Sequence, residues 1–262
     1  MIESLDDPRL TPFIDVTKPD KRESPVRFVV EGENVVRRLL ASDYKCESIV
    51  CAQRKAERIR PIVPEGVEFL VLEEKLVADL VGFKFHSGVM AMGLHRPMLE
   101  PAQLLDLPLP AGQVRSVILV LPEMNDPANL GTILRSAAAL GVRGVLLGER
   151  CRDPFVRHTI RTSMGAIFNL PLAKSKSLTE DLRMLSDRHG VQTWATVLAD
   201  DAVPLERANL GPSVALLLGS EAGLTDADVA ACTGRVTIPM RRGTDSLNVA
   251  AAAAVFLYHF CQ

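Results

Sequence analysis

The stretch SVILVLPEMNDPANLGTILRSAAALGVRGVLLG, residues 116–148, decides the fold. It begins with a continuous apolar run at 116–123, passes through a polar turn and ends in a second apolar run at 144–148. Pro127 suits the first turn of a helix, so we predict that a helix begins there. Apolar runs without polar alternation are typical of strands that are covered on both faces. We therefore expect an α/β fold with a mostly parallel sheet and helices on each side.

The rest of the chain extends this pattern in both directions. Further apolar runs at 190–198 and 213–219 predict two more buried strands. Towards the N-terminus, helical patterns at 35–42, 54–60 and 73–80 alternate with strand patterns at 27–30, 48–51, 67–72 and 87–94. This alternation predicts a small α/β sandwich. We expect an N-terminal domain over 1–96 with a loosely structured arm at 1–25, a proline-rich linker over 97–113 and a second domain over 114–262.

Composition limits the functional classes. The net charge is −2, so a nucleic-acid partner would have to be bound by local basic patches. The five cysteines form no CxxC pair, and no histidine stands at metal-ligand spacing, so we expect free thiols and no metal. The N-terminus is acidic and polar, and the apolar run from Val249 to Tyr258 is shorter than the roughly 20 residues of a membrane span. We expect a soluble, cytoplasmic protein without membrane contact.

The first segment with chemical potential is NDPANLGTILRSA, residues 125–137. Asn129 and Arg135 are six residues apart, which on one helix is about 120° after whole turns are subtracted. They would share a face only if Asn129 preceded the regular helix. We therefore expect Asn129 in the turn and Arg135 on the helix, both aimed at the cleft beyond the carboxyl end of the strand, where ligands bind in open α/β sheets.

Two later segments carry the same kind of signal. In LGSEAGL, residues 218–224, Gly219 and Gly223 bracket Glu221 directly after a buried strand. Glycines there permit a tight turn and close approach of a ligand. In IPMRRGTDSLNV, residues 238–249, Ser246 precedes an alanine-rich helix and is expected to be its N-cap. No G-x-G-x-x-G follows a predicted strand, so the usual dinucleotide loop is absent from the sequence.

Together the three segments resemble the signature motifs of the SpoU (TrmH-like) family, within the SPOUT class of RNA methyltransferases. The segment RTSMGAIFNLP (161–171) resembles the connecting region of the family. The resemblance implies a domain with a deep trefoil knot, a homodimer formed through that domain, and S-adenosylmethionine as cofactor. The N-terminal part is similar to the substrate-binding domain of many members, which resembles ribosomal proteins that bind kinked RNA. The residues of this similarity are FVVEG (28–32) and HSGVMAMG (86–93).

The resemblance also implies roles for individual residues. The expected reaction is methyl transfer to a ribose 2′-hydroxyl of ribosomal or transfer RNA, with ribosomal RNA favoured by the separate N-terminal domain. The residues expected to bind the cofactor are Thr196, Leu218, Gly219, Glu221, Ile238, Met240, Ser246 and Leu247. The residues expected to serve catalysis are Asn129, Arg135, Glu221, Ser246 and Asn248. Because the pKa of an arginine is too high for a general base, we favour Arg135 as a holder of a phosphate or oxyanion, with a phosphate or water taking the proton.

Basic residues in both domains are candidates for the RNA groove. They are Arg54, Lys55, Arg58 and Arg60 in the first domain and Arg152, Arg157, Arg161, Arg241 and Arg242 in the second. Two alternatives stay open: an RNA-binding protein that has the fold without catalysis, and a knotted methyltransferase that modifies a base. The intact motif residues argue against the first, and the Asn–Arg and Ser-Leu-Asn motifs favour ribose over a base.

Overall fold

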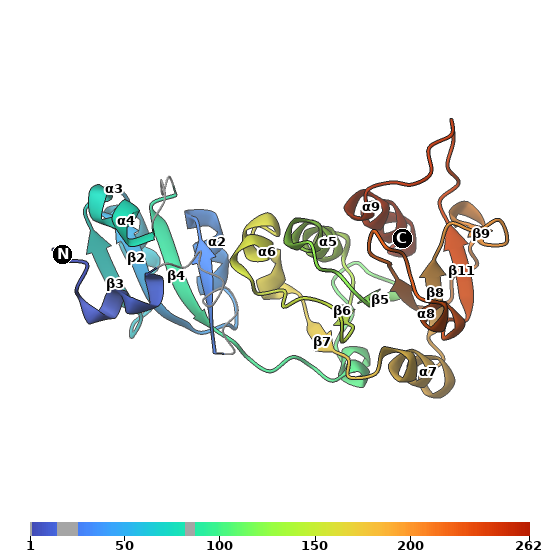
Figure 1. Ribbon diagram of the computed structural model, residues 1–262. Helices are drawn as coiled ribbons and strands as arrows, with labels where there is room; N and C mark the ends of the chain where they lie inside the picture. Colours follow the sequence, from blue (N-terminus) through green and yellow to red (C-terminus); the bar gives the residue numbers. More distant parts are fainter. Residues whose placement is uncertain (1, 15–25, 82–86) are drawn as a thin grey trace. The chain divides into compact units, whose positions relative to one another are not determined.

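The computed structural model describes residues 2–14, 26–81 and 87–262. The chain forms two compact units, and most of their helices and strands are labelled in Figure 1. The first unit comprises Met1–Pro97 and Asp153–Asn169, and the second comprises Met98–Arg152 and Leu170–Gln262. The predicted domain limits at 97–113 stay a prediction. The structure adds that a segment from the middle of the chain belongs to the first unit.

Seven strands form the sheet of the second unit, in the order β7-β6-β5-β10-β8-β11-β9, and every neighbouring pair is parallel. In chain order they are β5 (Ser116–Leu121), β6 (Gly144–Leu147), β7 (Leu172–Lys174), β8 (Gln192–Thr196), β9 (Val203–Pro204), β10 (Ser213–Leu217) and β11 (Gly234–Thr237). All residues of β5 and β6 are buried, as their continuous apolar sequence requires. The expected parallel sheet is confirmed.

Helices cover this sheet on both sides, with α5 and α9 on one face and α7 and α8 on the other (Figure 1). Their bounds are α5 (Pro127–Leu140), α7 (Leu178–His189), α8 (Asp226–Ala230) and α9 (Val249–Phe260). The predicted start of α5 at Pro127 is confirmed, with Asp126 as its N-cap. Buried Ala250 and Ala253 let α9 pack closely against α5. Within the described residues, no helix has the length and apolar character needed to span a membrane.

The first unit contains a four-stranded sheet in the order β1-β4-β2-β3. The pairs β1–β4 and β4–β2 are antiparallel, whereas β2–β3 is parallel. Its strands are β1 (Arg27–Glu31), β2 (Cys46–Ala52), β3 (Glu68–Leu72) and β4 (Val89–Leu94), and its helices in this part of the chain are α2 (Glu33–Leu40), α3 (Gln53–Ile59) and α4 (Glu74–Val81). These elements agree with the small α/β unit predicted from the alternating patterns.

The first residues of the chain are packed, and the expectation of a loose arm is wrong for residues 2–14. Ile2 pairs with Leu72 of β3, and residues 8–13 form the 3-10 helix η1 (Pro8–Phe13). Leu10 and Phe13 are fully buried in the core of the first unit. The sequence did not predict this packing, because Leu10 and Phe13 lie in a segment that is otherwise polar and rich in proline. The remaining part of the expected arm, residues 15–25, lies outside the described residues.

The segment Asp153–Asn169, which contains α6 (Arg157–Thr162), completes the core of the first unit. The Phe155 ring lies 5.0 Å from the Phe28 ring, and the Phe168 ring lies 5.8 Å from it. Arg157 donates to Glu31 at 2.7 Å, at the end of β1. Aromatic packing and an ion pair therefore join this segment to the strand that opens the first unit.

Part of the stretch predicted as a linker is regular and buried. Leu99 forms a β-bridge with Ala173 of β7, and η3 (Pro101–Leu105) buries Leu104 completely. The Arg143 guanidinium donates to the carbonyls of Leu105 and Leu107 and so holds the chain that follows η3. These residues extend the second unit beyond the edge of its sheet.

Candidate active site

The loop after β10 is a tight turn that only glycine permits at its first position. A Cβ on Gly219 would lie 2.8 Å from the carbonyl carbon of Gly223, which is closer than real Cβ contacts. Gly223 has a φ of +81° and donates its N–H to the carbonyl of Ser220 at 2.9 Å. The two glycines therefore bring the ends of this turn together and place Glu221 at its exposed tip.

Three motif residues meet beside this turn. The Asn129 Nδ2 donates to the Glu221 Oε1 at 2.5 Å, and the Asn248 Nδ2 donates to the Asn129 Oδ1 at 3.2 Å. Asn129 lies in the first turn of α5, and its N–H donates to the N-cap Asp126. The expectation that Asn129 precedes the helix is therefore wrong. The amide of Asn129 links segments that are 92 and 119 residues away in the chain.

The start of α9 differs from the sequence expectation. Asn248 is the N-cap, and its Oδ1 accepts the N–H groups of Ala250 and Ala251 at 2.9 and 3.4 Å. The prediction of Ser246 as the N-cap is wrong by two residues. Asn, like Ser, is a favoured N-cap, so composition alone did not separate them. Asn248 thus caps α9 through its oxygen and binds Asn129 through its nitrogen.

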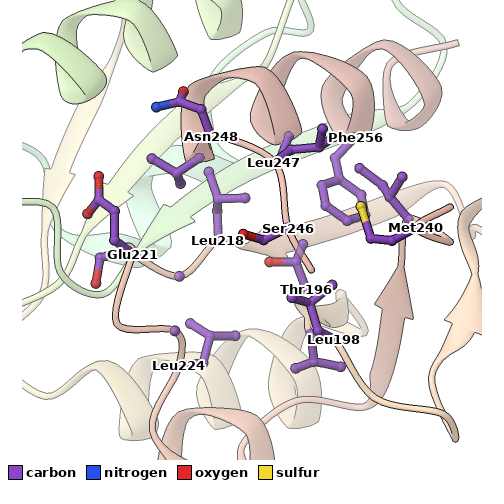
Figure 2. A pocket seen from close by; sticks show the side chains of 17 residues that line it. Thr196, Leu198, Leu218, Glu221, Leu224, Met240, Ser246, Leu247, Asn248 and Phe256 are labelled. Carbon is purple, nitrogen blue, oxygen red and sulfur yellow. The ribbon is translucent and has the colours of Figure 1, made fainter. Parts of the chain in front are cut away.

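A cavity of about 530 Å³ opens beside the same residues (Figure 2). It is lined by the chain after β8, β10 and β11 and by one face of α9. All eight residues expected to bind a cofactor line it: Thr196, Leu218, Gly219, Glu221, Ile238, Met240, Ser246 and Leu247. A cavity of this size at the carboxyl ends of parallel strands is suited to a small organic ligand.

Some lining residues were not found from the sequence. Leu198, Leu224 and Phe256 add apolar surface to the cavity, and Figure 2 shows them around its margin. Leu198 is 62% exposed, so its side chain is accessible to a ligand in the cavity. Phe256 and Ala252 are four residues apart on α9, so helical spacing from Asn248 could have revealed this face.

Arg135 is placed apart from the cavity. It is exposed on α5 and is not among the residues that line the cavity. Because Asn129 lies within the regular helix, six residues of separation turn Arg135 away from it by about 120°. The expectation that both side chains aim at one cleft is therefore wrong for a single chain. Of the five expected catalytic residues, Glu221, Ser246 and Asn248 line the cavity and Asn129 is bonded to two of them.

The basic residues of the first unit are largely engaged with acidic or aromatic partners. Arg54 pairs with Glu74 at 2.9 Å, and Arg60 stacks over the Phe69 ring at 5.0 Å. Glu33 forms ion pairs with three side chains: Lys55 at 3.3 Å, Arg37 at 3.2 Å, and Arg58. Burial alone would raise the pKa of Glu33, but hydrogen bonds from Arg58, Arg37 and Lys55 outweigh it and lower the pKa. Much of the positive charge that was expected to bind RNA is thus neutralised by carboxylates of the first unit.

The other expected RNA contacts fall on both units. In the first unit, Arg157 pairs with Glu31, and an Nη2 of the exposed Arg161 lies 3.2 Å from the His158 Nδ1. In the second, Arg241 and Arg242 are exposed on the loop that precedes Ser246. Arg152 is the last residue of the segment Met98–Arg152 of the second unit, and its backbone N–H donates to the carbonyl of Met124 at 3.3 Å. Among these residues, Arg241 and Arg242 are the ones that lie in the chain between two cavity-lining residues, Met240 and Ser246.

The fold and the cavity define a parallel α/β protein with a ligand site at the carboxyl edge of its sheet. Residues 116–258 match the model of the SpoU rRNA Methylase family, and the chain belongs to this family. It is 34% identical to an uncharacterized tRNA/rRNA methyltransferase of Mycobacterium bovis, over 97% of this chain and 88% of that protein.

Two further relatives have more specific descriptions. The chain is 27% identical to the 23S rRNA (guanosine(2553)-2'-O)-methyltransferase RlmP of Bacillus subtilis, over 98% of each chain. The crystal structure of an AdoMet-bound rRNA methyltransferase from Sinorhizobium meliloti superposes with a TM-score of 0.81 at 28% identity, over 98% of this chain and 95% of that one. The similarity thus extends over both units and is not confined to the matched family region.

Proposed function

We propose that this protein transfers a methyl group from S-adenosylmethionine to a ribose 2′-hydroxyl of RNA. The observation that carries the proposal is the cavity at the edge of the sheet, with the bonded residues Asn129, Glu221 and Asn248 at its side. Membership of the SpoU family supports the reaction class. The naming of relatives as 2′-O-methyltransferases supports ribose over base as the acceptor.

The cavity suits S-adenosylmethionine in size and chemistry. Its volume of about 530 Å³ lies in the range of sites for ligands of this size. Leu198, Leu247 and Phe256 offer apolar surface to a nucleoside, and the glycine turn lets backbone N–H and C=O groups approach. The bound cofactor would supply an electrophilic methyl group. The neighbouring structure from Sinorhizobium meliloti, described as AdoMet bound, supports this choice of ligand.

The chain's own residues would act by positioning. Asn129 and Asn248 hold Glu221 at one margin of the cavity, which fixes the loop that borders the reacting atoms. Alignment of two reactants supplies a large part of the rate in such a displacement. Within one chain Arg135 is turned away from the cavity, so its planar set of donors would hold an RNA phosphate or the developing oxyanion only in the proposed homodimer. A phosphate or water would then take the hydroxyl proton.

The substrate and the assembly are finer parts of the proposal. Ribosomal RNA is favoured over transfer RNA because specific relatives are named for 23S rRNA. A homodimer through the second unit is supported by the apolar surface of α9, where Val255 is 43% and Tyr258 63% exposed. The trefoil knot stays a prediction of the family resemblance. Free cysteines support a cytoplasmic location.

Calorimetry with S-adenosylmethionine tests the first step. Saturable binding to the purified protein is expected, and its absence would favour an RNA-binding protein without catalysis. The second step is incubation with rRNA from cells that lack this gene, followed by nuclease digestion and mass spectrometry. A methyl group on ribose is expected, whereas a methyl group on a base would replace this proposal with base modification.

A further inference from the structure

Arg150 connects the loop that follows β5 with α8, the helix that follows the glycine turn of the cavity. It follows β6, outside every motif described above. Its Nε donates to the Glu123 Oε2 at 3.1 Å, and its Nη2 donates to the Asp228 Oδ2 at 3.0 Å. Glu123 lies in the loop between β5 and α5, ahead of Asn129. Asp228 lies in α8, directly after the glycine turn.

The Asp228 end of this bridge is buried and structurally demanding. Asp228 is 2% exposed, and its Oδ2 also accepts the Thr225 Oγ1 at 2.7 Å and the Thr225 N–H at 3.4 Å. Thr225 is the N-cap of α8, so Asp228 closes a capping box with it. A buried carboxylate is costly without a cation, and Arg150 supplies one. The start of α8 is therefore fixed to the loop after β6.

The turn that lines the cavity ends at this anchored point. Leu224, which lines the cavity and is labelled in Figure 2, directly precedes Thr225 in the sequence. At the tip of the turn, Glu221 accepts a hydrogen bond from Asn129. The turn is thus held at its tip by α5 and at its end by α8, and Arg150 binds Glu123 ahead of α5 and Asp228 within α8.

The Glu123 end of the bridge is more open. The Glu123 side chain is 39% exposed and also accepts the Asn125 Nδ2 at 2.9 Å. Desolvation by itself would lower the pKa of Arg150, but the hydrogen bonds to Asp228 and Glu123 outweigh it and raise the pKa. A guanidinium presents its donors in a rigid planar fork, which suits two carboxylates at fixed positions, whereas the donors of a lysine rotate at the end of a flexible stem.

We propose that Arg150 is a positioning residue for methyl transfer, which fixes the glycine turn 219–224 relative to the loop between β5 and α5 that leads to Asn129. The inference rests on the proposed function. It predicts two separable effects: the Asp228 contact maintains affinity for the cofactor, and the Glu123 contact maintains the geometry of turnover.

Arg150→Met tests the bridge as a whole, with Arg235→Met as the matched control. Arg235 forms an exposed ion pair with Asp201 at 2.9 Å in the same unit, away from the cavity lining. Hydrogen exchange of the ligand-free protein reports on the loop without any cofactor. In Arg150→Met we expect faster exchange confined to residues 219–230 and affinity for S-adenosylmethionine reduced about tenfold or more. Arg235→Met should change neither.

Normal exchange at 219–230 together with normal cofactor affinity in Arg150→Met would overturn the proposal. So would exchange that rises equally throughout the second unit, since that indicates a general loss of stability. If the wild-type protein itself failed to bind S-adenosylmethionine, the proposed function would be contradicted, while the exchange measurement would still decide whether Arg150 holds the turn.

Glu123→Gln and Arg150→Lys separate the two contacts, and they also serve if Arg150→Met does not fold. Both leave a cation on Asp228, so exchange at 219–230 and cofactor affinity should stay within about threefold of wild type, while kcat falls about tenfold. Unchanged kcat in both variants would overturn the role of the Glu123 contact. Cofactor affinity as low in Arg150→Lys as in Arg150→Met would overturn the role of charge at Asp228.

Discussion

Asn248 shows how one side chain serves both stability and the site. Its oxygen caps α9, and its nitrogen binds Asn129, which in turn binds Glu221. A cap contributes about 1 kcal/mol, and that contribution depends on the acceptor oxygen alone. The role in the site depends on the donor nitrogen. Substitutions that keep one atom type and lose the other therefore separate the two roles.

Asn248→Asp retains the cap and loses the donor. We expect thermal stability close to wild type, because Asp is as good an N-cap as Asn. Methyl transfer should fall about tenfold or more, because Asn129 loses a partner and Glu221 gains a neighbouring negative charge. Asn248→Ala should lose activity and also about 1 kcal/mol of stability. Thermal unfolding and single-turnover assays check both; equal stability loss in the two variants would contradict the argument.

Arg135→Lys tests a bidentate role for this arginine. Arg135 does not line the cavity, so affinity for S-adenosylmethionine should be unchanged. Turnover should fall about tenfold, because lysine cannot present two parallel donors to a phosphate or oxyanion. Calorimetry and steady-state kinetics measure the two effects, with Arg235→Lys as the control. Full turnover and full RNA affinity in Arg135→Lys would rule out a bidentate role.

Among the helices and strands, long and buried ones were predicted from the sequence and the shortest ones were not. The long apolar strands β5 and β10 and the helix from Pro127 were predicted because their patterns extend over many residues. The strands β7 and β9, of 3 and 2 residues, are too short to carry a pattern. The 3-10 helix η1 was missed because Leu10 and Phe13 are separated by Thr11 and Pro12. Packing against β3 gives that segment its structure.

The residues of the candidate site also fall into those that the sequence predicted and those that it did not. The residues of the glycine turn were predicted because a carboxylate between glycines after a buried strand is uncommon in packing. Arg150 was missed, because its role depends on contacts with Glu123 and Asp228, which are 27 and 78 residues away. The placement of Asn129 was wrong although the start of α5 at Pro127 was predicted, because the helix is already regular at Asn129, whose N–H donates to the N-cap Asp126. Its position within the helix decides which way Arg135 points.

Gly219→Ala tests the turn after β10 as an element. The added Cβ would lie 2.8 Å from the backbone of Gly223, and backbone cannot give way as a flexible side chain does. Overpacking of this kind costs about 1–3 kcal/mol, and we expect cofactor affinity to fall at least tenfold. In the control Gly211→Ala, the new Cβ meets only the flexible end of Gln192, so binding should be normal. Normal affinity in both variants would contradict the close-approach argument.

At the scale of the whole molecule, the position of residues 153–169 makes a prediction about stability. Phe155 is 3% exposed and packs against Phe28 in the first unit, although it lies within the matched family region. Phe155→Ala should cost about 3–5 kcal/mol. Hydrogen exchange should accelerate in β1 and β2 and much less in β5 and β10. The control Phe260→Ala, in α9, should give the opposite pattern; loss of protection in the second unit alone by Phe155→Ala would contradict it.

RNA affinity should fall steeply with salt. Each phosphate contact should add about 0.7–0.9 to the negative slope of the logarithm of the binding constant against the logarithm of the salt concentration. Arg241 and Arg242 are exposed beside the cavity, whereas Lys55 and Arg58 are engaged with Glu33. Replacing Arg241 and Arg242 by alanine should therefore reduce the salt slope more than replacing Lys55 and Arg58. Binding titrations across a range of salt concentrations measure this. An affinity independent of salt would contradict phosphate recognition.

The membership of Asp153–Asn169 in the first unit also bears on how such proteins diversify. The chain crosses between the units after Pro97, after Arg152 and before Leu170. A recombination event with one breakpoint near residue 97 would separate residues 153–169 from their aromatic neighbours in the first unit. Engineered chimaeras should therefore transplant residues 153–169 together with the N-terminal part of the chain.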